Sequence, residues 1–360
     1  MQLLNILFLD KPLRLEASMA GWQQLYWDNQ LVAQQEARTD IEHSNKLEFT
    51  LTRGDQKLPC QLEFGLDWQP FQLRYRAYAD GDCIAEGERN SDDIARQTLV
   101  VKPAKVKNTS TIGLLSLGFK LFKSAKVIKL AFAGASLAAY SWLFSLPFAL
   151  SLLAVLVFHE YGHIRAMKYF GMKTKGIYLI PFVGGMALSD EKINTRWQDV
   201  VISIMGPTFG LIMSVVALLL YWLTGEVFFA ALASLNAMLN VFNLLPILPL
   251  DGGHILKSIS FSMNSMAGLL MCVGGAALGV WISYSLGLAL LGLLLLVGSI
   301  EILAEWKGRH RSHLLPLDRY GQVFSTLWYL LTVAGLVGII VVLSDSDEPL
   351  LRLPLSILQS

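Results

Sequence analysis

Charged residues are scarce in this 360-residue chain. Lys, Arg, Asp and Glu make up 16% of it, and 54% of the residues are hydrophobic, whereas soluble globular domains contain about 25% charged residues. This composition excludes an intrinsically disordered chain and argues against an ordinary soluble enzyme. Cysteine is also scarce. The chain has three, and this small, odd number does not suggest a disulfide framework. The net charge of +1 gives no indication of a nucleic-acid partner, and we expect none.

The few charges are unevenly distributed along the chain. Residues 1–100 contain 10 Lys and Arg and 16 Asp and Glu, whereas the other 260 residues contain 19 and 12. The first residues lack the basic segment and the unbroken apolar stretch of a secretory signal peptide. We therefore expect a soluble, cytoplasmic N-terminal domain over residues 1–100, followed by a membrane domain.

The N-terminal domain has the pattern of β-strands. Residues 46–53 and 71–78 alternate between polar and apolar side chains, as half-buried strands do. Turn signals occur at Asp28-Asn29, Gly54-Asp55 and Asp80-Gly81. Residues 27–34 resemble residues 79–86 at a shift of 52, which indicates either two related hairpins in a small antiparallel sheet or sandwich, or a chance similarity. No catalytic pattern is visible here, and the sequence leaves the role of this domain open.

Residues 101–127 connect the two parts of the chain. Seven lysines and no acidic residue occur between positions 101 and 129. The pattern is typical of a basic amphipathic helix that lies on an anionic membrane surface. A solvated flank of the first membrane span on the cytoplasmic side explains the same lysines.

Seven apolar stretches are long enough to cross a bilayer. They lie at about 128–146, 147–168, 198–222, 226–250, 266–284, 286–304 and 324–343. The connections after the second, fourth and sixth stretches are basic or longer, and the opposite connections contain no Lys or Arg. The positive-inside rule therefore predicts a multi-pass protein with a cytoplasmic N-terminus and an external C-terminus. We expect the membrane to be a bacterial inner membrane. Beyond a core at 128–305, we expect a basic cytoplasmic loop (306–323), an additional helix (324–343) and an external tail (344–360).

The second apolar stretch contains the sequence His159-Glu160-Tyr161-Gly162-His163. Histidines four residues apart lie on one face of a helix and can share a metal ion. The adjacent Glu160 is placed to accept a proton from a metal-activated water. Ionisable residues inside a membrane are costly and mark functional sites. The alternative is a helix end at the membrane interface, where His163 and Arg165 reach water.

A catalytic zinc site has three protein ligands, so the chain must supply one more. The best candidate is Asp251, because Pro246 and Pro249 interrupt the helix before it and non-helical backbone at membrane depth lines a cavity. Asp251 could instead cap the helix that follows it. His254, three residues further on, could support a ligand or lie on the helix surface.

These two motifs resemble the site-2 protease family of intramembrane zinc metalloproteases. The resemblance covers roughly residues 128–305 and rests on the HEYGH sequence together with Asn243-x-x-Pro-x-x-Pro-Leu-Asp251-Gly-Gly. It implies that His159, His163 and Asp251 bind Zn²⁺ and that Glu160 is the general base. It also implies that Asn243 faces the active site and steadies the substrate or the oxyanion.

The resemblance extends to two further segments. Gly206-Pro207 matches a family motif, although the asparagine that often follows it is replaced by Thr208-Phe209-Gly210. Residues 176–187 resemble a short membrane-dipping β-hairpin whose edge could pair with an unwound substrate. On this basis Val183, Gly184 and Gly185 are expected to bind substrate.

The expected fold class is a polytopic α-helical membrane protein of about seven spans, with a site-2-protease-like core and an N-terminal mainly-β domain. The expected activity is hydrolysis of peptide bonds in membrane-spanning protein substrates, with the lipid bilayer as the other partner. The sequence also allows a catalytically silent scaffold with a structural zinc site, or a metal or proton transporter that uses the same residues. The oligomeric state, the substrate and the trigger of cleavage are left open.

Overall fold

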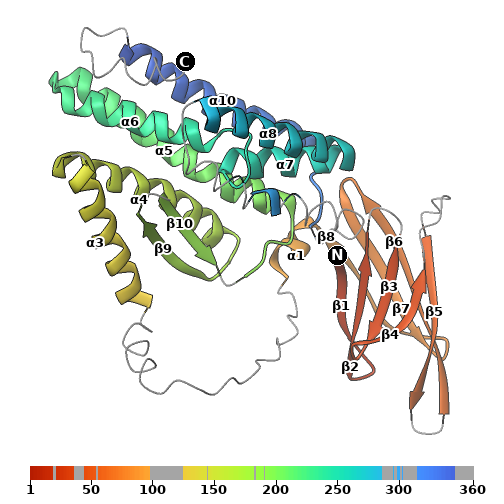
Figure 1. Cartoon of the computed structure of the whole chain (residues 1–360). Helices are drawn as coiled ribbons and strands as arrows, with labels where there is room; N and C mark the ends of the chain where they lie inside the picture. Colours follow the sequence, from red (N-terminus) through yellow and green to blue (C-terminus); the bar gives the residue numbers. More distant parts are fainter. Residues whose placement is uncertain are drawn as a thin grey trace.

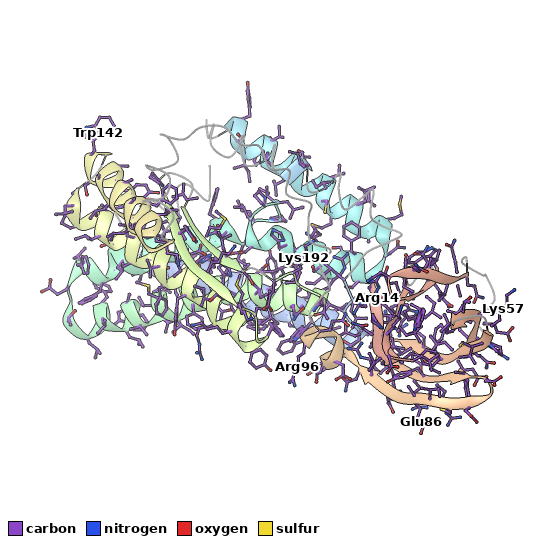
Figure 2. The ribbon with its side chains drawn as sticks, turned by 90° about the horizontal axis from the view of Figure 1, so that it is seen from below. Arg14, Lys57, Glu86, Arg96, Trp142 and Lys192 are labelled. Carbon is purple, nitrogen blue, oxygen red and sulfur yellow. The ribbon has the colours of Figure 1, made fainter. Side chains whose placement is uncertain are left out.

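The structure is a computed structural model. It describes residues 1–18, 22–35, 44–53, 56–97, 125–143, 145–181, 184–189, 191–285 and 314–344, with residues 295, 298–300 and 302. Figure 1 shows a β-rich domain at one end of the molecule and a bundle of helices at the other, with the short helix α1 at the junction. Trp142 and Lys57 lie at opposite ends of this elongated arrangement (Figure 2).

Two four-stranded antiparallel sheets form the N-terminal domain. The first contains β1 (Gln2–Phe8), β2 (Lys11–Ala17), β3 (Gln23–Trp27) and β4 (Gln30–Gln35), and the second contains β5 (Ser44–Arg53), β6 (Gln56–Trp68), β7 (Phe71–Ala79) and β8 (Asp82–Asn90). In each sheet the strands pair in sequence order. The expected antiparallel β structure is therefore present, and it comprises two sheets of equal size.

The proposed repeat is visible in the last hairpin of each sheet. The β3–β4 turn has positive φ at Asp28 and Asn29, and the β7–β8 turn has positive φ at Asp80 and Gly81, as tight hairpin turns require. The register of β3–β4 shifts between Leu25 and Tyr26, and that of β7–β8 shifts between residues 77 and 78. The hairpin turns and the register shifts thus both recur at a spacing of 52 residues.

Apolar side chains from both sheets share one core. Leu15, Leu25, Leu62 and Leu73 are fully buried in it, as the alternating pattern requires. Leu315, which lies far along the chain, is packed into the same core and is 3% exposed. The N-terminal domain is therefore completed by a residue from the membrane part of the chain.

The membrane part consists of helices and one short β-hairpin. In chain order these elements are α3 (Ala125–Leu143), α4 (Leu146–Tyr169), β9 (Thr174–Ile180), β10 (Gly184–Ser189), α5 (Arg196–Thr224), α6 (Val227–Asn243), α7 (Asp251–Met263), α8 (Ser265–Ser285) and α10 (Arg319–Ser344). The expected hairpin is present, because β9 and β10 pair antiparallel with Gly184 opposite Ile180. A second apolar core joins α5, α6, α7 and α10.

Within the described part of the chain, four helices are long and apolar enough to cross a membrane. They are α4, α5, residues 266–285 of α8, and α10. This supports a membrane protein, and the total of about seven spans remains a prediction. Most of the expected span at 286–304 lies outside the described residues.

The expected fourth span, 226–250, is interrupted earlier than the hydropathy indicates. Its helix, α6, ends at Asn243, and the chain is non-helical from there to Asp251. Pro246 and Pro249 explain the break, because proline has no backbone N–H for the helix. The break places Asp251 at the start of a separate helix.

Short contacts connect the two domains at α1 (Ser91–Arg96). The Asn194 side-chain amide donates to the backbone carbonyl of Gln97 at 2.7 Å, and Gln198 donates to that of Ala95 at 2.8 Å. Leu315 bonds through its backbone to the segment at Asn194 that precedes α5. The β domain is thus attached to the N-terminal end of α5.

Candidate metal centre

Helix α4 carries the two histidines of the HEYGH sequence. Ser145 caps the helix by accepting a hydrogen bond from the Phe148 backbone, and Pro147 stands in its first turn, where proline is tolerated. The helical spacing places both imidazoles on one buried face, with their Nε2 atoms 3.1 Å apart. Their rings meet edge to face, with centroids 4.8 Å apart. Both Nε2 atoms therefore point to one place.

Asp251 reaches the same place from α7. Its Oδ2 atom lies 3.2 Å from Nε2 of His159 and 3.5 Å from Nε2 of His163. Asp251 is the first residue of α7, and the cap position before it is Leu250, which makes no side-chain cap hydrogen bond. The alternative in which Asp251 acts only as the helix cap is therefore not what the structure shows.

The three ligand atoms fit a zinc ion. Zinc binds His nitrogen and carboxylate oxygen at about 2.0–2.2 Å in tetrahedral geometry, which separates neighbouring ligand atoms by roughly 3.3–3.6 Å. The separations here of 3.1, 3.2 and 3.5 Å are close to that range. Among the described residues, His159, His163 and Asp251 are the one group of His, Cys, Asp and Glu that could hold a metal ion.

The second nitrogen of each imidazole faces an acceptor. Nδ1 of His163 lies 2.7 Å from the Ile202 carbonyl of α5, and Nδ1 of His159 lies 2.7 Å from Oδ1 of Asn240 on α6. A carbonyl oxygen can only accept, so Nδ1 of His163 carries the proton and its Nε2 presents a lone pair. This is the tautomer that a metal ligand requires.

Glycine permits the close packing of α5 on the two histidines. A Cβ at Gly206 would lie 2.9 Å from Cε1 of His159 and closer still to the ring of His163. Only a residue without a side chain fits this position while both rings keep their places. The Gly206-Pro207 pair, noted from the sequence, therefore has a direct steric role beside the metal centre.

Glu160 lies between the histidines in sequence and against β10 in space. It is 5% exposed. A Cβ at Gly185 would lie 2.6 Å from its Oε1 atom, so the β10 backbone passes directly beside the carboxylate. Gly185 thus lies next to the candidate base, whereas a Cβ at Gly184 would approach only Leu156 and Val183 falls outside the described residues.

Two further sequence candidates, Asn243 and His254, lie on α6 and α7. Asn243 is the last residue of α6 and half-buried, and its side chain makes no hydrogen bond to any residue that the structure describes. His254 lies with its Nδ1 atom 3.7 Å from Oδ1 of Asp199. A carboxylate of α5 is therefore one of its contact partners.

Sequence reasoning missed two residues of this centre. Asn240 was not among the predicted site residues, yet it hydrogen-bonds His159. Asp199 was not singled out, yet its buried carboxylate contacts both Ser258 and His254 of α7. The spacing of Asn236, Asn240 and Asn243 on one helix was the sequence signal that could have indicated Asn240. No sequence signal indicated Asp199.

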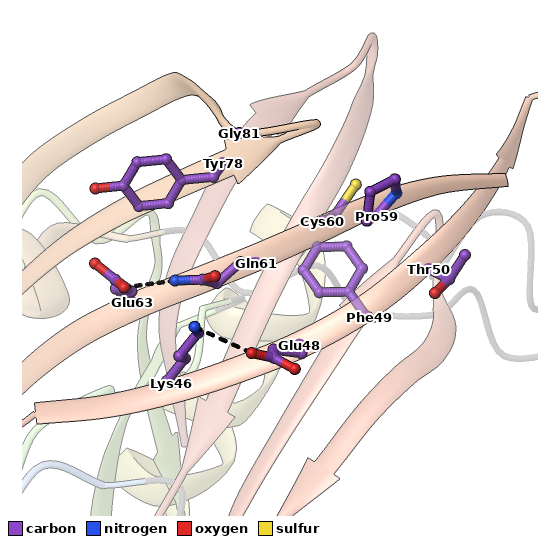
Figure 3. Close-up of a pocket in the computed structure, with 10 residues that line it drawn as sticks. All are labelled: Lys46, Glu48, Phe49, Thr50, Pro59, Cys60, Gln61, Glu63, Tyr78 and Gly81. Atoms are coloured by element: carbon purple, nitrogen blue, oxygen red, sulfur yellow. Dashed lines mark hydrogen bonds and ion pairs between the residues drawn. The ribbon is translucent and has the colours of Figure 1, made fainter.

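A hollow of about 700 Å³ on the β domain is a separate candidate site. Figure 3 shows the residues that line it on β5, β6 and β7 and in the turn between β7 and β8. Its polar groups largely bond one another, because Lys46 pairs with Glu48 at 3.0 Å and Gln61 donates to Glu63 at 2.5 Å. No cluster of catalytic or metal-ligating side chains lines it, so the metal centre remains the candidate active site.

The fold and this centre define a class of protein: a membrane protein with a histidine–histidine–aspartate group that could hold a metal ion, and an adjacent buried glutamate. The family model of Peptidase family M50 matches residues 147–227 and 223–278. Through this region the chain is similar to that family, the site-2 proteases. The match includes all three candidate ligands, Glu160 and Asn243.

Three curated proteins are similar to this chain. A putative zinc metalloprotease of Synechocystis is 31% identical over 199 residues, which are 54% of this chain and 47% of that protein. A zinc metalloprotease of Methanocaldococcus jannaschii is 36% identical over 109 residues, 29% of this chain and 31% of that protein. Stage IV sporulation protein FB of Bacillus subtilis is 27% identical over 188 residues, 48% and 63% respectively. The matches thus span between about a third and two thirds of these relatives.

Proposed function

We propose that this protein is an intramembrane zinc metalloprotease that hydrolyses peptide bonds of membrane-spanning proteins. The observation that carries the proposal is the convergence of His159, His163 and Asp251 beside the buried Glu160, within apolar helices. The match to the family model and the names of the two metalloprotease relatives support the same chemistry.

The chain's own residues supply the proton transfers in this proposal. A zinc ion held by His159, His163 and Asp251 would supply Lewis acidity for the scissile carbonyl and the attacking water. Glu160 accepts a proton from the water and delivers it to the leaving amine. Asn243, at the end of α6, binds the substrate carbonyl or the oxyanion that develops there.

The β-hairpin is the proposed binding place for the substrate backbone. A membrane-spanning helix bonds its own backbone groups, so it must unwind locally before a carbonyl can be attacked. Among the described strands, β10 pairs only with β9 and has a second edge free. An unwound substrate segment that pairs with this edge at Val183, Gly184 and Gly185 would lie beside Glu160.

The proposed topology places the site towards the cytoplasm. His159 lies 13 residues after the start of α4 at Leu146, which corresponds to about 20 Å along the helix. In a hydrocarbon core about 30 Å thick, this is nearer the end of α4 that connects to the basic segment at 164–196. Water then enters, and products leave, on the side of the N-terminal domain.

The test is cleavage of a single-span model substrate by the full chain in proteoliposomes. Glu160→Gln should keep its zinc and lose cleavage by at least about 100-fold, since general-base catalysis contributes roughly 10²–10⁴-fold. The matched control is Glu226→Gln, which changes an exposed carboxylate at the start of α6 and should cleave normally. Cleavage by Glu160→Gln at the unaltered rate would overturn the proposal.

The same preparation separates the alternative functions. Zinc in the unaltered protein without cleavage of any membrane substrate would indicate a scaffold. Zinc or proton flux into the vesicles that His159→Ala abolishes would indicate a transporter. Absence of zinc, with no effect of His159→Ala, would overturn the assignment of the metal centre itself.

A further inference from the structure

Three residues form a continuous chain of buried hydrogen bonds behind His159. Nδ1 of His159 contacts Oδ1 of Asn240 at 2.7 Å, and Nδ2 of Asn240 donates to Oδ1 of Asn236 at 2.8 Å. Nδ2 of Asn236 donates to Oγ of Ser214 at 2.9 Å. Both asparagines are 0% exposed. The chain joins α4, α6 and α5 through their interior.

Backbone carbonyls fix the direction of these bonds. Nδ2 of Asn236 also donates to the Gly210 carbonyl at 2.7 Å, and Nδ2 of Asn240 also donates to the Asn236 carbonyl at 2.8 Å. Carbonyl oxygens only accept, so both amide nitrogens are assigned without ambiguity. The remaining Oδ1 of Asn240 must then accept from Nδ1–H of His159. Nε2 of His159 is left as the atom with a free lone pair.

The space for Asn240 exists because position 210 is glycine. A Cβ at Gly210 would overlap the Cγ, Nδ2 and Oδ1 atoms of Asn240. The α5 backbone therefore passes against the amide that holds His159. An added methyl group there would displace the amide while leaving His159 itself intact.

We propose that Asn240 is a positioning residue that fixes the tautomer of His159 for metal binding, with Asn236 and Gly210 holding Asn240 in place. The proposal deepens the proposed function, because it rests on the assignment of His159 as a zinc ligand. The two histidines are held unequally: His163 by a backbone carbonyl and His159 by a side chain. Only the second can be altered by substitution of its acceptor.

The test measures zinc affinity and histidine tautomer in the full chain in detergent micelles. Asn240→Leu removes the acceptor from Nδ1 of His159, and zinc affinity should fall about 10- to 100-fold, as it does when partners of metal-bound histidines are removed. In metal-free protein with ¹⁵N-labelled histidine, the His159 signal, assigned by its loss in His159→Ala, should shift from the Nδ1–H to a mixed or Nε2–H form.

Asn240→Asp separates positioning from a purely structural role. The carboxyl group keeps an acceptor for His159 but loses the bonds from the amide to Asn236, so the His159 tautomer and most of the zinc affinity should be preserved. Ser234→Ala, at a buried position on the same helix that takes no part in the chain, should change neither measurement. A merely structural role would impair Asp and Leu variants alike.

Gly210→Ala provides an independent perturbation. It keeps the identity of every side chain of the site and displaces the Asn240 amide by steric overlap. It should lower zinc affinity in the same direction as Asn240→Leu, whereas Gly338→Ala, where a Cβ meets nothing within 4 Å, should not. An unchanged tautomer in Asn240→Leu, or equal zinc affinity in Asn240→Leu and Asn240→Asp, would overturn the proposal. If His159→Ala itself left zinc affinity unchanged, the metal centre and the proposed function would fail instead.

Discussion

Ser258 of α7 donates a hydrogen bond of 2.5 Å to the buried carboxylate of Asp199 on α5. The two helices carry different parts of the metal centre, because α7 begins with Asp251 and the Ile202 carbonyl of α5 holds His163. The bond therefore links α7, which carries the candidate ligand Asp251, to α5, whose backbone orients the candidate ligand His163.

Ser258→Ala should weaken this link. The substitution leaves a buried carboxylate oxygen without its hydroxyl donor, which costs about 1–3 kcal/mol. We expect a lower free energy of unfolding in detergent and weaker zinc binding. Ser260→Ala is the matched control, since Ser260 lies on the same helix but bonds only back to the Leu256 carbonyl. Equal stability of the two variants would contradict the role given to Ser258.

Gly206→Ala should abolish metal binding by displacing the imidazoles. The new Cβ would lie 2.9 Å from Cε1 of His159 and closer to the His163 ring, so α5 or both rings must move. The measurement is zinc stoichiometry of the purified protein by elemental analysis. Gly134→Ala, in α3 with nothing within 4 Å of its Cβ, should retain full zinc, and retention by Gly206→Ala would show that the packing is looser than described.

The two candidate histidine ligands could be predicted because their relative geometry is local. His159 and His163 share a helix, and the prolines before Asp251 indicate a break in an otherwise apolar stretch. The partner of His159 could not be predicted in this way. Asn236, Asn240 and Asn243 fall near one face of α6, and which of them meets His159 depends on how α6 is rotated against α4, which long-range packing decides.

The β domain shows the same limit for a repeat. The spacing of 52 relates Leu25 to Ala77, but their partners on the preceding strands, Leu15 and Leu62, are 47 apart. The reason is where each pair lies in its hairpin: Leu15 is two residues from the end of β2, whereas Leu62 is six residues from the end of the longer strand β6. Local similarity therefore identified the last hairpin of each sheet and not the whole sheet. The burial of Leu315 in this domain is a long-range contact without a sequence signal.

Leu315→Ala should destabilise the N-terminal domain although it lies more than 200 residues away in sequence. Leu315 is 3% exposed in the core of the two sheets, and truncation of a buried leucine costs about 2–5 kcal/mol. Thermal unfolding of the β domain, followed by tryptophan fluorescence, should shift to lower temperature. Leu7→Ala removes the same atoms from a side chain that is 71% exposed and should have little effect. If both variants unfolded alike, Leu315 would not belong to this core.

Thiol labelling tests the burial of the cysteines and the orientation of the chain together. Cys83 is exposed on β8, whereas Cys60 and Cys272 are buried, and burial also raises the pKa of the Cys60 thiol, which lowers its thiolate fraction at neutral pH. A membrane-impermeant maleimide should therefore label the native protein at one site, which Cys83→Ser removes, and the denatured protein at three.

In sealed vesicles the same reagent reports which side of the membrane holds the β domain. Inverted vesicles expose the cytoplasmic face, so Cys83 should be labelled there and protected in right-side-out vesicles until detergent is added. The opposite pattern would place the N-terminal domain outside and reverse the orientation that the basic connections predict. Because α4 runs from one face to the other, the reversal would also move the metal centre from the cytoplasmic to the external side of the bilayer.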